Sequence, residues 1–249
     1  MKKTKVRIMN KKDNKDAIKS YINERKPNNR YASFDYCYNY FYNFYKSNSL
    51  KKLANDENLE QSCLQLGFYL ASWGMMRGST FMLKKYSSRN LGKLIKAISE
   101  MKRKLWEIDV DSYDEGNIKL LLECKEKIKV ALGKNNNPSD TLVTKIMLGV
   151  FANVPAFDQN FKKAMKAYKF DEKSLGKIKE LYDKNEKLFE SFKIRTIDFK
   201  TGKETDIRYT NAKLIDMAGF EHGKKLIERK KGKRKKKEIR TGNAPSIHL

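Results

Sequence analysis

The spacing of apolar residues along the chain predicts a protein built mainly from α-helices. Its most unusual stretch is FDYCYNYFYNFY, residues 34–45, which carries eight aromatic rings in twelve positions. A helix would place Phe34, Tyr38 and Phe41 on one stripe, whereas a strand would gather the even-numbered rings on one face. Ser33 is a candidate N-cap and no turn signal interrupts the run, so we expect a broad amphipathic helix that is mostly core. A second interpretation leaves some of the tyrosines as an open surface for stacking bases.

Helical periodicity recurs along most of the remaining chain. We expect helices over residues 17–25, 57–86, 91–108, 117–132, 141–154, 155–168, 171–192 and 211–228. Ser139 or Asp140 is expected to cap the helix that follows GKNNNPSD. Residues 194–209 alternate polar and apolar side chains around a turn at Thr201 and Gly202, which predicts a small β-hairpin. The predicted fold class is therefore mainly α, a bundle-like helical domain with one small hairpin and flexible basic termini.

The distribution of charge divides the chain into three parts. Residues 1–30 hold eleven basic and three acidic side chains and are expected to form a basic N-terminal arm. Residues 31–227 carry the apolar periodicity and are expected to form the helical core domain. Residues 228–249 lose that periodicity, and we expect a disordered basic tail there.

The net charge points to a polyanionic partner. The chain has 55 Lys and Arg against 30 Asp and Glu, a formal charge of +25, which would repel itself unless an anion lay nearby. Clustered cations neutralise phosphates and release counterions, so we expect a nucleic-acid partner, DNA ahead of RNA. The residues of the tail expected to contact phosphates are Lys230, Lys231, Lys233, Arg234, Lys235, Lys236 and Lys237. A rival explanation is codon usage alone, because 44 of the basic residues are lysines.

Several classes of protein are disfavoured by what the sequence lacks. The three cysteines are widely spaced and the two histidines stand alone, so we expect a reducing, cytoplasmic location and no metal site. No glycine-rich phosphate loop or dinucleotide fingerprint is present, and no cofactor is expected. No uncharged apolar run reaches the ~18 residues of a membrane span, so no membrane partner is expected.

Two residues in LASWGMMRGS are candidates for a binding cleft. Arg77 falls inside an otherwise apolar, glycine-bearing stretch that is expected to be helical, where an unpaired charge would be costly. It is expected to form a buried ion pair, with Asp158 or Asp216 as partner, or else to clamp a phosphate at a cleft. Trp73 lies one turn earlier and is placed to stack on a base.

The segment TLVTKIMLGVFANVPAFDQNF carries the one candidate for catalysis. An apolar helix ends at Pro155, and Asp158 then opens the next helix. Over residues 138–161 this layout resembles the helix-hairpin-helix DNA glycosylase superfamily. The resemblance implies that Asp158 lies over the sugar of an extruded nucleotide, stabilises positive charge as the base leaves and activates water. Asp140 stands where that family carries a lysine, so Lys145 is the nearby candidate nucleophile. The plain alternative is that Asp158 only caps its helix.

Two further interpretations remain at this stage. The segments YLASWGM-RGS and VPA-D resemble an uncharacterised family of bacterial or phage-type helical proteins, which suggests an origin in a mobile element or phage defence. The chain is also consistent with a protein-interaction module, for example an inhibitor of an acidic partner protein. The three hypotheses are thus a nucleic-acid binder, a glycosylase-like enzyme and an interaction module.

Overall fold

The computed structural model describes residues 10–240, and for residues 231 and 233–240 it describes the backbone alone. The helices in this part of the chain are α1 (Lys11–Glu24), α2 (Ser33–Lys46), α3 (Leu59–Ser72), α4 (Phe81–Lys84), α5 (Gly92–Ser99), α6 (Glu115–Ala131), α7 (Asp140–Phe151), α8 (Gln159–Met165), α9 (Glu172–Ser191) and α10 (Asn211–Arg240). The strands are β1 (Arg195–Ile197) and β2 (Glu204–Arg208). Short 3-10 turns cover Arg30–Ala32, Leu50–Ala54, Ser88–Leu91, Arg103–Trp106, Val110–Ser112 and Lys134–Asn136. The predicted mainly α fold class is confirmed.

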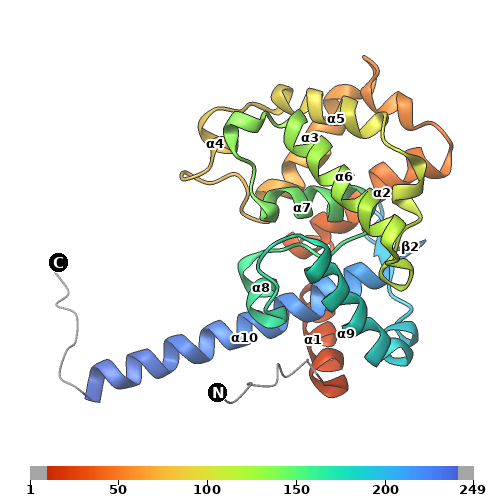
Figure 1. Cartoon of the computed structure of the whole chain (residues 1–249). Coiled ribbons are helices and arrows are strands. Elements are labelled where there is room, and N and C mark those ends of the chain that lie inside the picture. The colour runs from red at the N-terminus through yellow and green to blue at the C-terminus, as the bar shows by residue number, and fades with distance from the viewer. Residues whose placement is uncertain (1–9, 241–249) are drawn as a thin grey trace.

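The helices form two layers. Helices α2 to α7 make one layer, and α1, α8, α9 and α10 make the other, below it in Figure 1. A single cluster of buried apolar side chains runs through both layers, from Ala17 in α1 to Phe220 in α10. No helix within residues 10–240 combines the length and the apolar content that crossing a membrane requires.

The first helix belongs to this core. The sequence predicted only a short helix over residues 17–25 inside a mobile basic arm, but α1 begins at Lys11 and lies against α10. Its apolar face is fully buried through Ala17, Ile18 and Tyr21. The expectation of a mobile arm is therefore corrected for residues 11–30. Burying the apolar face of α1 lowers the free energy by more than the conformational entropy of a mobile, lysine-rich segment would. Residues 1–9 lie outside the described part of the chain.

The aromatic stretch forms α2 as predicted, with three of its eight rings buried and four more partly buried against the core. Phe34, Tyr38 and Phe41 are buried along one stripe, and the rings of Phe34 and Tyr38 stack with centroids 5.5 Å apart. The predicted N-cap is wrong by one position, since Ala32 occupies it and the Ser33 hydroxyl donates to the carbonyl of Arg30 at 2.6 Å. The alternative of an open stacking surface is not supported for these buried rings.

Two predicted helices are shorter than their apolar patterns suggested. In the block expected over residues 57–86, α3 ends at Ser72 and an irregular loop leads to α4. Gly74 stops α3 with a φ of +73°, a conformation that glycine adopts without strain. In the block expected over residues 91–108, α5 ends at Ser99, whose hydroxyl donates to the carbonyl of Lys96 at 2.8 Å. Such local bonds compete with continuation of the helix.

The predicted hairpin is present. Strands β1 and β2 pair antiparallel, with Arg195 opposite Arg208 and Ile197 opposite Glu204. Helix α2 anchors the hairpin to the core, because Asp35 accepts a hydrogen bond from the backbone N–H of Ile197 at 3.0 Å.

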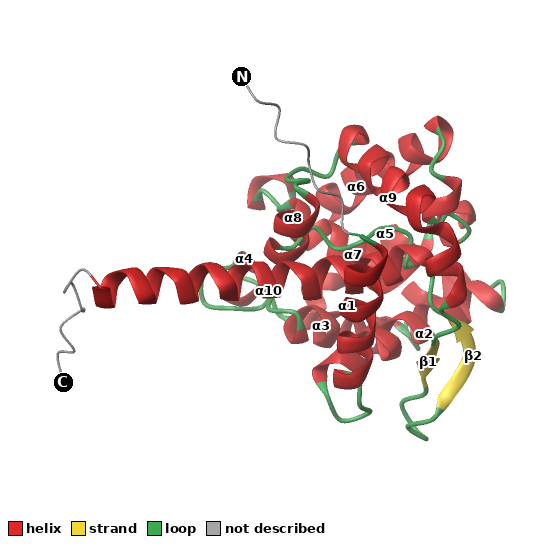
Figure 2. Ribbon diagram, turned by 90° about the horizontal axis from the view of Figure 1, so that it is seen from below, coloured by secondary structure: helices red, strands yellow, loops and turns green. Residues whose placement is uncertain are grey.

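Helix α10 is the longest described helix and connects the core with the basic end of the chain. Asp109 caps it from a distance, accepting hydrogen bonds from the backbone N–H groups of Asn211 and Ala212 at 2.7 and 2.8 Å. The sequence predicted a helix only to residue 228 followed by disorder, whereas the helix continues through Arg240. Lysine and arginine are good helix formers, and no proline interrupts the run. The second half of α10 projects from the body on the side where α4 and α8 lie (Figures 1 and 2). Residues 241–249 lie outside the described part.

Candidate functional site

A cleft of about 930 Å³ brings together candidates that are far apart in the sequence. Its walls come from the loop after α3, from α4, from the beginning of α7 and from α8. Four residues singled out from the sequence line it, namely Trp73, Arg77, Lys145 and Asp158. They come from three separate segments, so their convergence is a property of the fold.

Lys145 and Asp158 form an ion pair in this cleft. The Lys145 Nζ lies 3.2 Å from Oδ2 of Asp158, and the two side chains are 5% and 15% exposed. The other carboxylate oxygen of Asp158 accepts a hydrogen bond from the backbone N–H of Phe161 at 2.9 Å, which caps α8. The capping role of Asp158 is therefore real, and the carboxylate also faces the cleft with a cation beside it.

Trp73 is held between basic groups at the edge of the same cleft. The Nζ of Lys145 lies 4.9 Å from the centroid of its ring, and the guanidinium of Arg30 lies 5.1 Å from it. The ring packs edge-on against Phe220 of α10 with centroids 5.5 Å apart. Trp73 is half-buried, so its ring is already stacked on protein groups and only part of it is open to a ligand.

The expected burial of Arg77 is wrong. Arg77 lies in the loop after α3, is exposed, and forms no ion pair with any described residue. Its two proposed partners are occupied instead by Lys145, which pairs with Asp158, and by Lys213, which pairs with Asp216. Because α3 stops before Arg77, the charge never enters the apolar interior. Its guanidinium lines the cleft and forms no ion pair with a described carboxylate.

The sequence analysis missed three further cations of the cleft, Arg30, Lys162 and Lys163. The two lysines follow Asp158 by four and five residues on α8, a local spacing that the sequence displays. Arg30 comes from the turn before α2, and nothing in the sequence signals its position beside Trp73. Including Arg77 and Lys145, five cations line the cleft against one carboxylate, so the lining has a net charge of +4.

A second Lys–Asp pair lies behind the first. Lys213 is 1% exposed, with its Nζ 3.0 Å from Oδ2 of Asp216 and donating to the hydroxyl of Tyr21 at 3.0 Å. Asp216 also accepts a hydrogen bond from the backbone N–H of Ala156 at 3.0 Å, which holds the turn that leads to Asp158. A void of about 10 Å³ touches both pairs, enough for about one water molecule.

The predicted phosphate contacts on the tail fall mostly outside the described side chains. Lys230 is exposed on α10 and does not line the cleft. The side chains of the other candidates, Lys231, Lys233, Arg234, Lys235, Lys236 and Lys237, lie outside the described residues.

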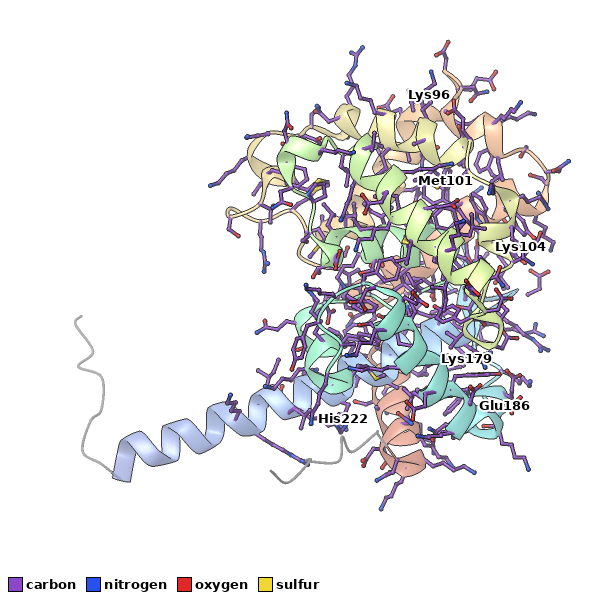
Figure 3. All side chains as sticks on the ribbon, in the orientation of Figure 1. Lys96, Met101, Lys104, Lys179, Glu186 and His222 are labelled. Atoms are coloured by element: carbon purple, nitrogen blue, oxygen red, sulfur yellow. The ribbon has the colours of Figure 1, made fainter. Side chains whose placement is uncertain are left out.

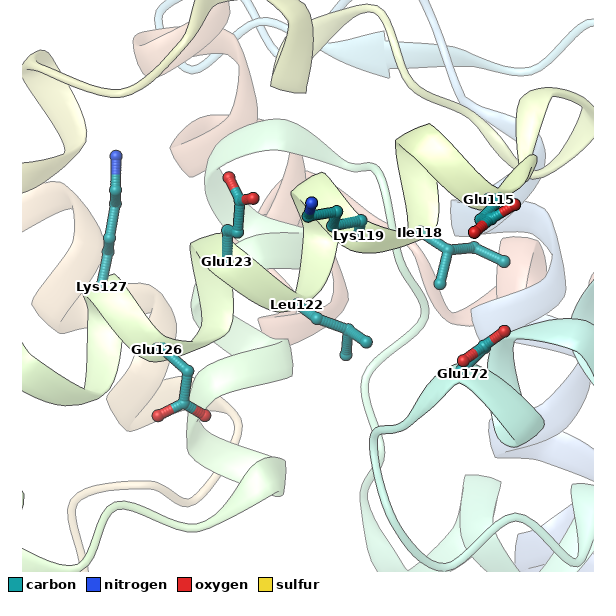
Figure 4. A pocket seen from close by; sticks show the side chains of 8 residues that line it. All are labelled: Glu115, Ile118, Lys119, Leu122, Glu123, Glu126, Lys127 and Glu172. Atoms are coloured by element: carbon teal, nitrogen blue, oxygen red, sulfur yellow. The ribbon is translucent and has the colours of Figure 1, made fainter.

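Another large hollow has the opposite charge. It measures about 690 Å³ and lies between α6 and the beginning of α9, where Ile118 and Leu122 form its apolar part (Figure 4). Its charged lining consists of Glu115, Glu123, Glu126, Glu172, Lys119 and Lys127, a net charge of −2. A polyanion is therefore expected at the cleft beside α8 and not at this hollow. No group of three or more metal-ligating side chains suitable for an ion is found among the described residues.

Comparison of the chain with protein-family models, with curated protein sequences and with solved structures found no match. The two resemblances noted from sequence motifs therefore remain predictions.

Proposed function

We propose that this protein binds nucleic acid through the cleft between α4, α7 and α8, with DNA ahead of RNA. The observation that carries the proposal is the lining of the cleft, where five cations face one carboxylate. Only Lys145 among these cations has a carboxylate partner, which leaves Arg30, Arg77, Lys162 and Lys163 for phosphates. Uncommitted cations in a concave site attract a polyanion and release its counterions.

The remaining lining suits an unpaired strand. The 62%-exposed ring of Tyr168 offers a face on which a base can stack without regard to sequence, and the open part of the Trp73 ring lies in the same cleft. Asn137 lines the same cleft, and its side-chain amide can bond to sugars and base edges. The sequence of α10 adds further cations, since residues 224–240 contain eleven basic and two acidic residues.

Binding is tested by the anisotropy of a fluorescein-labelled DNA oligonucleotide, single-stranded and duplex, over a series of KCl concentrations. Four phosphate contacts in the cleft alone predict a log–log slope of about −2.8 for a single strand, at roughly −0.7 per contact. Arg77→Gln with Lys162→Gln should reduce the magnitude of the slope by about 1.4. The matched control, Lys173→Gln with Lys187→Gln, removes two exposed cations of α9 that do not line the cleft and should leave the slope nearly unchanged. Absence of binding in dilute buffer would refute the proposal.

The arrangement around Asp158 favours a second candidate, a DNA glycosylase-like enzyme. Its carboxylate is fixed by the cap on α8, paired with Lys145 and turned to the same cleft. A fixed carboxylate in this position can stabilise positive charge that develops on a deoxyribose and can activate water.

This candidate predicts that Asp158→Asn abolishes release of a damaged or modified base and leaves DNA affinity equal or higher. Duplexes that each carry one uracil, oxidised purine or alkylated base serve as substrates. If the wild-type protein releases none of these bases, the enzymatic candidate is refuted and the binding proposal stands. Association with a protein partner that survives nuclease treatment would instead support the interaction module.

A further inference from the structure

A second basic pocket lies against the C-terminal end of α8. It measures about 560 Å³ and is formed where α1, α8 and α10 meet. Its charged and titratable lining consists of Asp13, Asp16, Lys163, Lys166, His222, Lys225 and Arg229. Figure 3 labels His222 on α10 at this junction. None of these residues was singled out from the sequence for binding.

The cations of this pocket are not neutralised by their neighbours. No ion pair within the described residues joins Lys163, Lys166, Lys225 or Arg229 to a carboxylate, although Asp13 and Asp16 line the same pocket. Four cations against two carboxylates leave a net charge of +2 with His222 neutral. Like charges held around one hollow repel, and a bound anion would offset that repulsion.

The pKa of His222 depends on the charged groups inside the pocket. The side chain is half-buried, and burial lowers the pKa of its imidazole below the usual range. Arg229 and Lys225 on the same helix lower this pKa further, while Asp13 on α1 opposes them. Asp16 on α1, Lys163 on α8 and Lys166 directly after α8 are the other charged groups around it. An anion between these groups would favour the imidazolium and supply a further hydrogen-bond acceptor.

The pocket and the cleft lie against the same helix. Lys163 of α8 lines both hollows. Helix α8 is held closely against α10, since a Cβ on Gly223 would lie 1.9 Å from the backbone oxygen of Asn160. A strand that passes from the cleft over Lys163 would therefore reach the cations of this pocket on α10, Lys225 and Arg229.

We propose that this pocket between α1, α8 and α10 binds a backbone phosphate of the nucleic acid whose neighbouring nucleotides occupy the cleft. The inference rests on the proposed function, and it extends the contact surface across α8 toward the basic end of α10. Inorganic phosphate shares the chemistry of a backbone phosphodiester, so the experiment has to separate the two sources.

His222 provides a specific spectroscopic probe. The chain has only two histidines, so His248→Gln leaves one imidazole signal to follow by NMR as pH is varied. The pKa of His222 is measured for the protein alone, with inorganic phosphate, and with a single-stranded DNA oligonucleotide at the same ionic strength. We expect the oligonucleotide to raise this pKa by roughly half a unit or more, because a phosphate adds negative charge next to the imidazole.

Removing the cations of the pocket should abolish this response. In Lys225→Gln with Arg229→Gln, the change in the pKa of His222 caused by the oligonucleotide should disappear. The same variant should bind the oligonucleotide roughly tenfold more weakly, with the salt slope reduced by about 1.4. The control with equal loss of charge is again Lys173→Gln with Lys187→Gln, whose residues line neither hollow.

Each outcome decides between the two claims. If Arg77→Gln with Lys162→Gln weakens binding while the pocket variant does not, and the oligonucleotide leaves His222 unchanged, the pocket is refuted and the proposed function stands. If inorganic phosphate alone moves the pKa of His222 and DNA does not, the pocket is an adventitious ion site only, which also refutes the inference. If the wild-type protein binds no oligonucleotide in dilute buffer, the proposed function fails and this inference fails with it.

Discussion

Lys145 on α7 and Asp158 at the beginning of α8 form an ion pair across the cleft, with Nζ 3.2 Å from Oδ2. The two residues are thirteen positions apart in the sequence and are joined through the turn that contains Pro155. Asp216 of α10 holds this turn in place, because its carboxylate accepts a hydrogen bond from the backbone N–H of Ala156. The Lys145–Asp158 pair is therefore held by a turn between two helices that is itself hydrogen-bonded to α10.

The pair should contribute to stability as a unit. Asp158→Asn keeps a good N-cap but leaves the Lys145 ammonium without its carboxylate, and should cost about 2–3 kcal/mol in the free energy of unfolding. Lys145→Met removes the cation, and in that background Asp158→Asn should cost clearly less. Urea denaturation of the wild type, both single variants and the double variant measures the coupling energy, expected at about 1–2 kcal/mol. Strict additivity of the two changes would show that the pair is not coupled.

The close approach of α8 to α10 should depend on Gly223. A Cβ there would lie 1.9 Å from the backbone oxygen of Asn160, so Gly223→Ala must push α8 away and should destabilise the protein by about 3 kcal/mol. Gly232 lies on the same helix with no heavy atom within 4 Å of an added Cβ. Gly232→Ala should therefore be neutral or stabilise by up to about 1 kcal/mol through helix propensity. Thermal unfolding of both variants makes the comparison, and equal effects would contradict it.

Stability should fall between about pH 4 and pH 6 because of Asp35. Burial raises the pKa of Asp35 to about 6, although Arg25 at 3.0 Å favours its ionised form. The folded protein then holds a proton that the unfolded chain, with a pKa near 3.8, has released. The stabilising contribution is complete below the unfolded pKa and is lost as pH rises through the folded pKa, about 3 kcal/mol for a shift of about two units.

Asp35→Asn removes this titrating group and tests its role. The unfolding free energy of the wild type minus that of the variant should decrease from pH 4 to pH 7, as measured by urea denaturation at several pH values. Asp109, whose pKa burial also raises to about 6, remains in both proteins and cancels in the difference. If the value for the wild type minus that for the variant rises with pH instead, the folded pKa of Asp35 lies below its unfolded value.

Ligand binding in the cleft should be visible in the emission of Trp73. The chain has two tryptophans, and Trp106 is buried and stacked on Tyr45 with centroids 5.7 Å apart. In Trp106→Phe, adding a DNA oligonucleotide should change the tryptophan emission, because the ligand displaces water and cations from around the half-buried Trp73 ring. Trp73→Phe, which keeps Trp106, should show no change on addition of the same DNA. A response that persists in Trp73→Phe would place the ligand elsewhere.

The sequence alone determined the features that arise from neighbouring residues. The rings of α2 follow the spacing of the helix, Ser139, one of the two predicted caps, caps α7, and the alternation around Gly202 forms the hairpin. Asp158 was identified because proline, aspartate and the start of a helix are adjacent in the chain. Periodicity and capping depend on contacts within one or two helical turns, so the order of residues is enough to specify them.

The tertiary structure decided which distant residues share a surface. The apolar sequence around Arg77 suggested a buried charge, but the glycine that stops α3 leaves that charge at the cleft with Arg30 and Lys162. The pocket around His222 likewise requires α1 and α10, from opposite ends of the chain, to pack together. These contacts between distant residues depend on how the apolar faces of whole helices pack against one another. That packing is set by the whole chain and is not encoded in any local pattern.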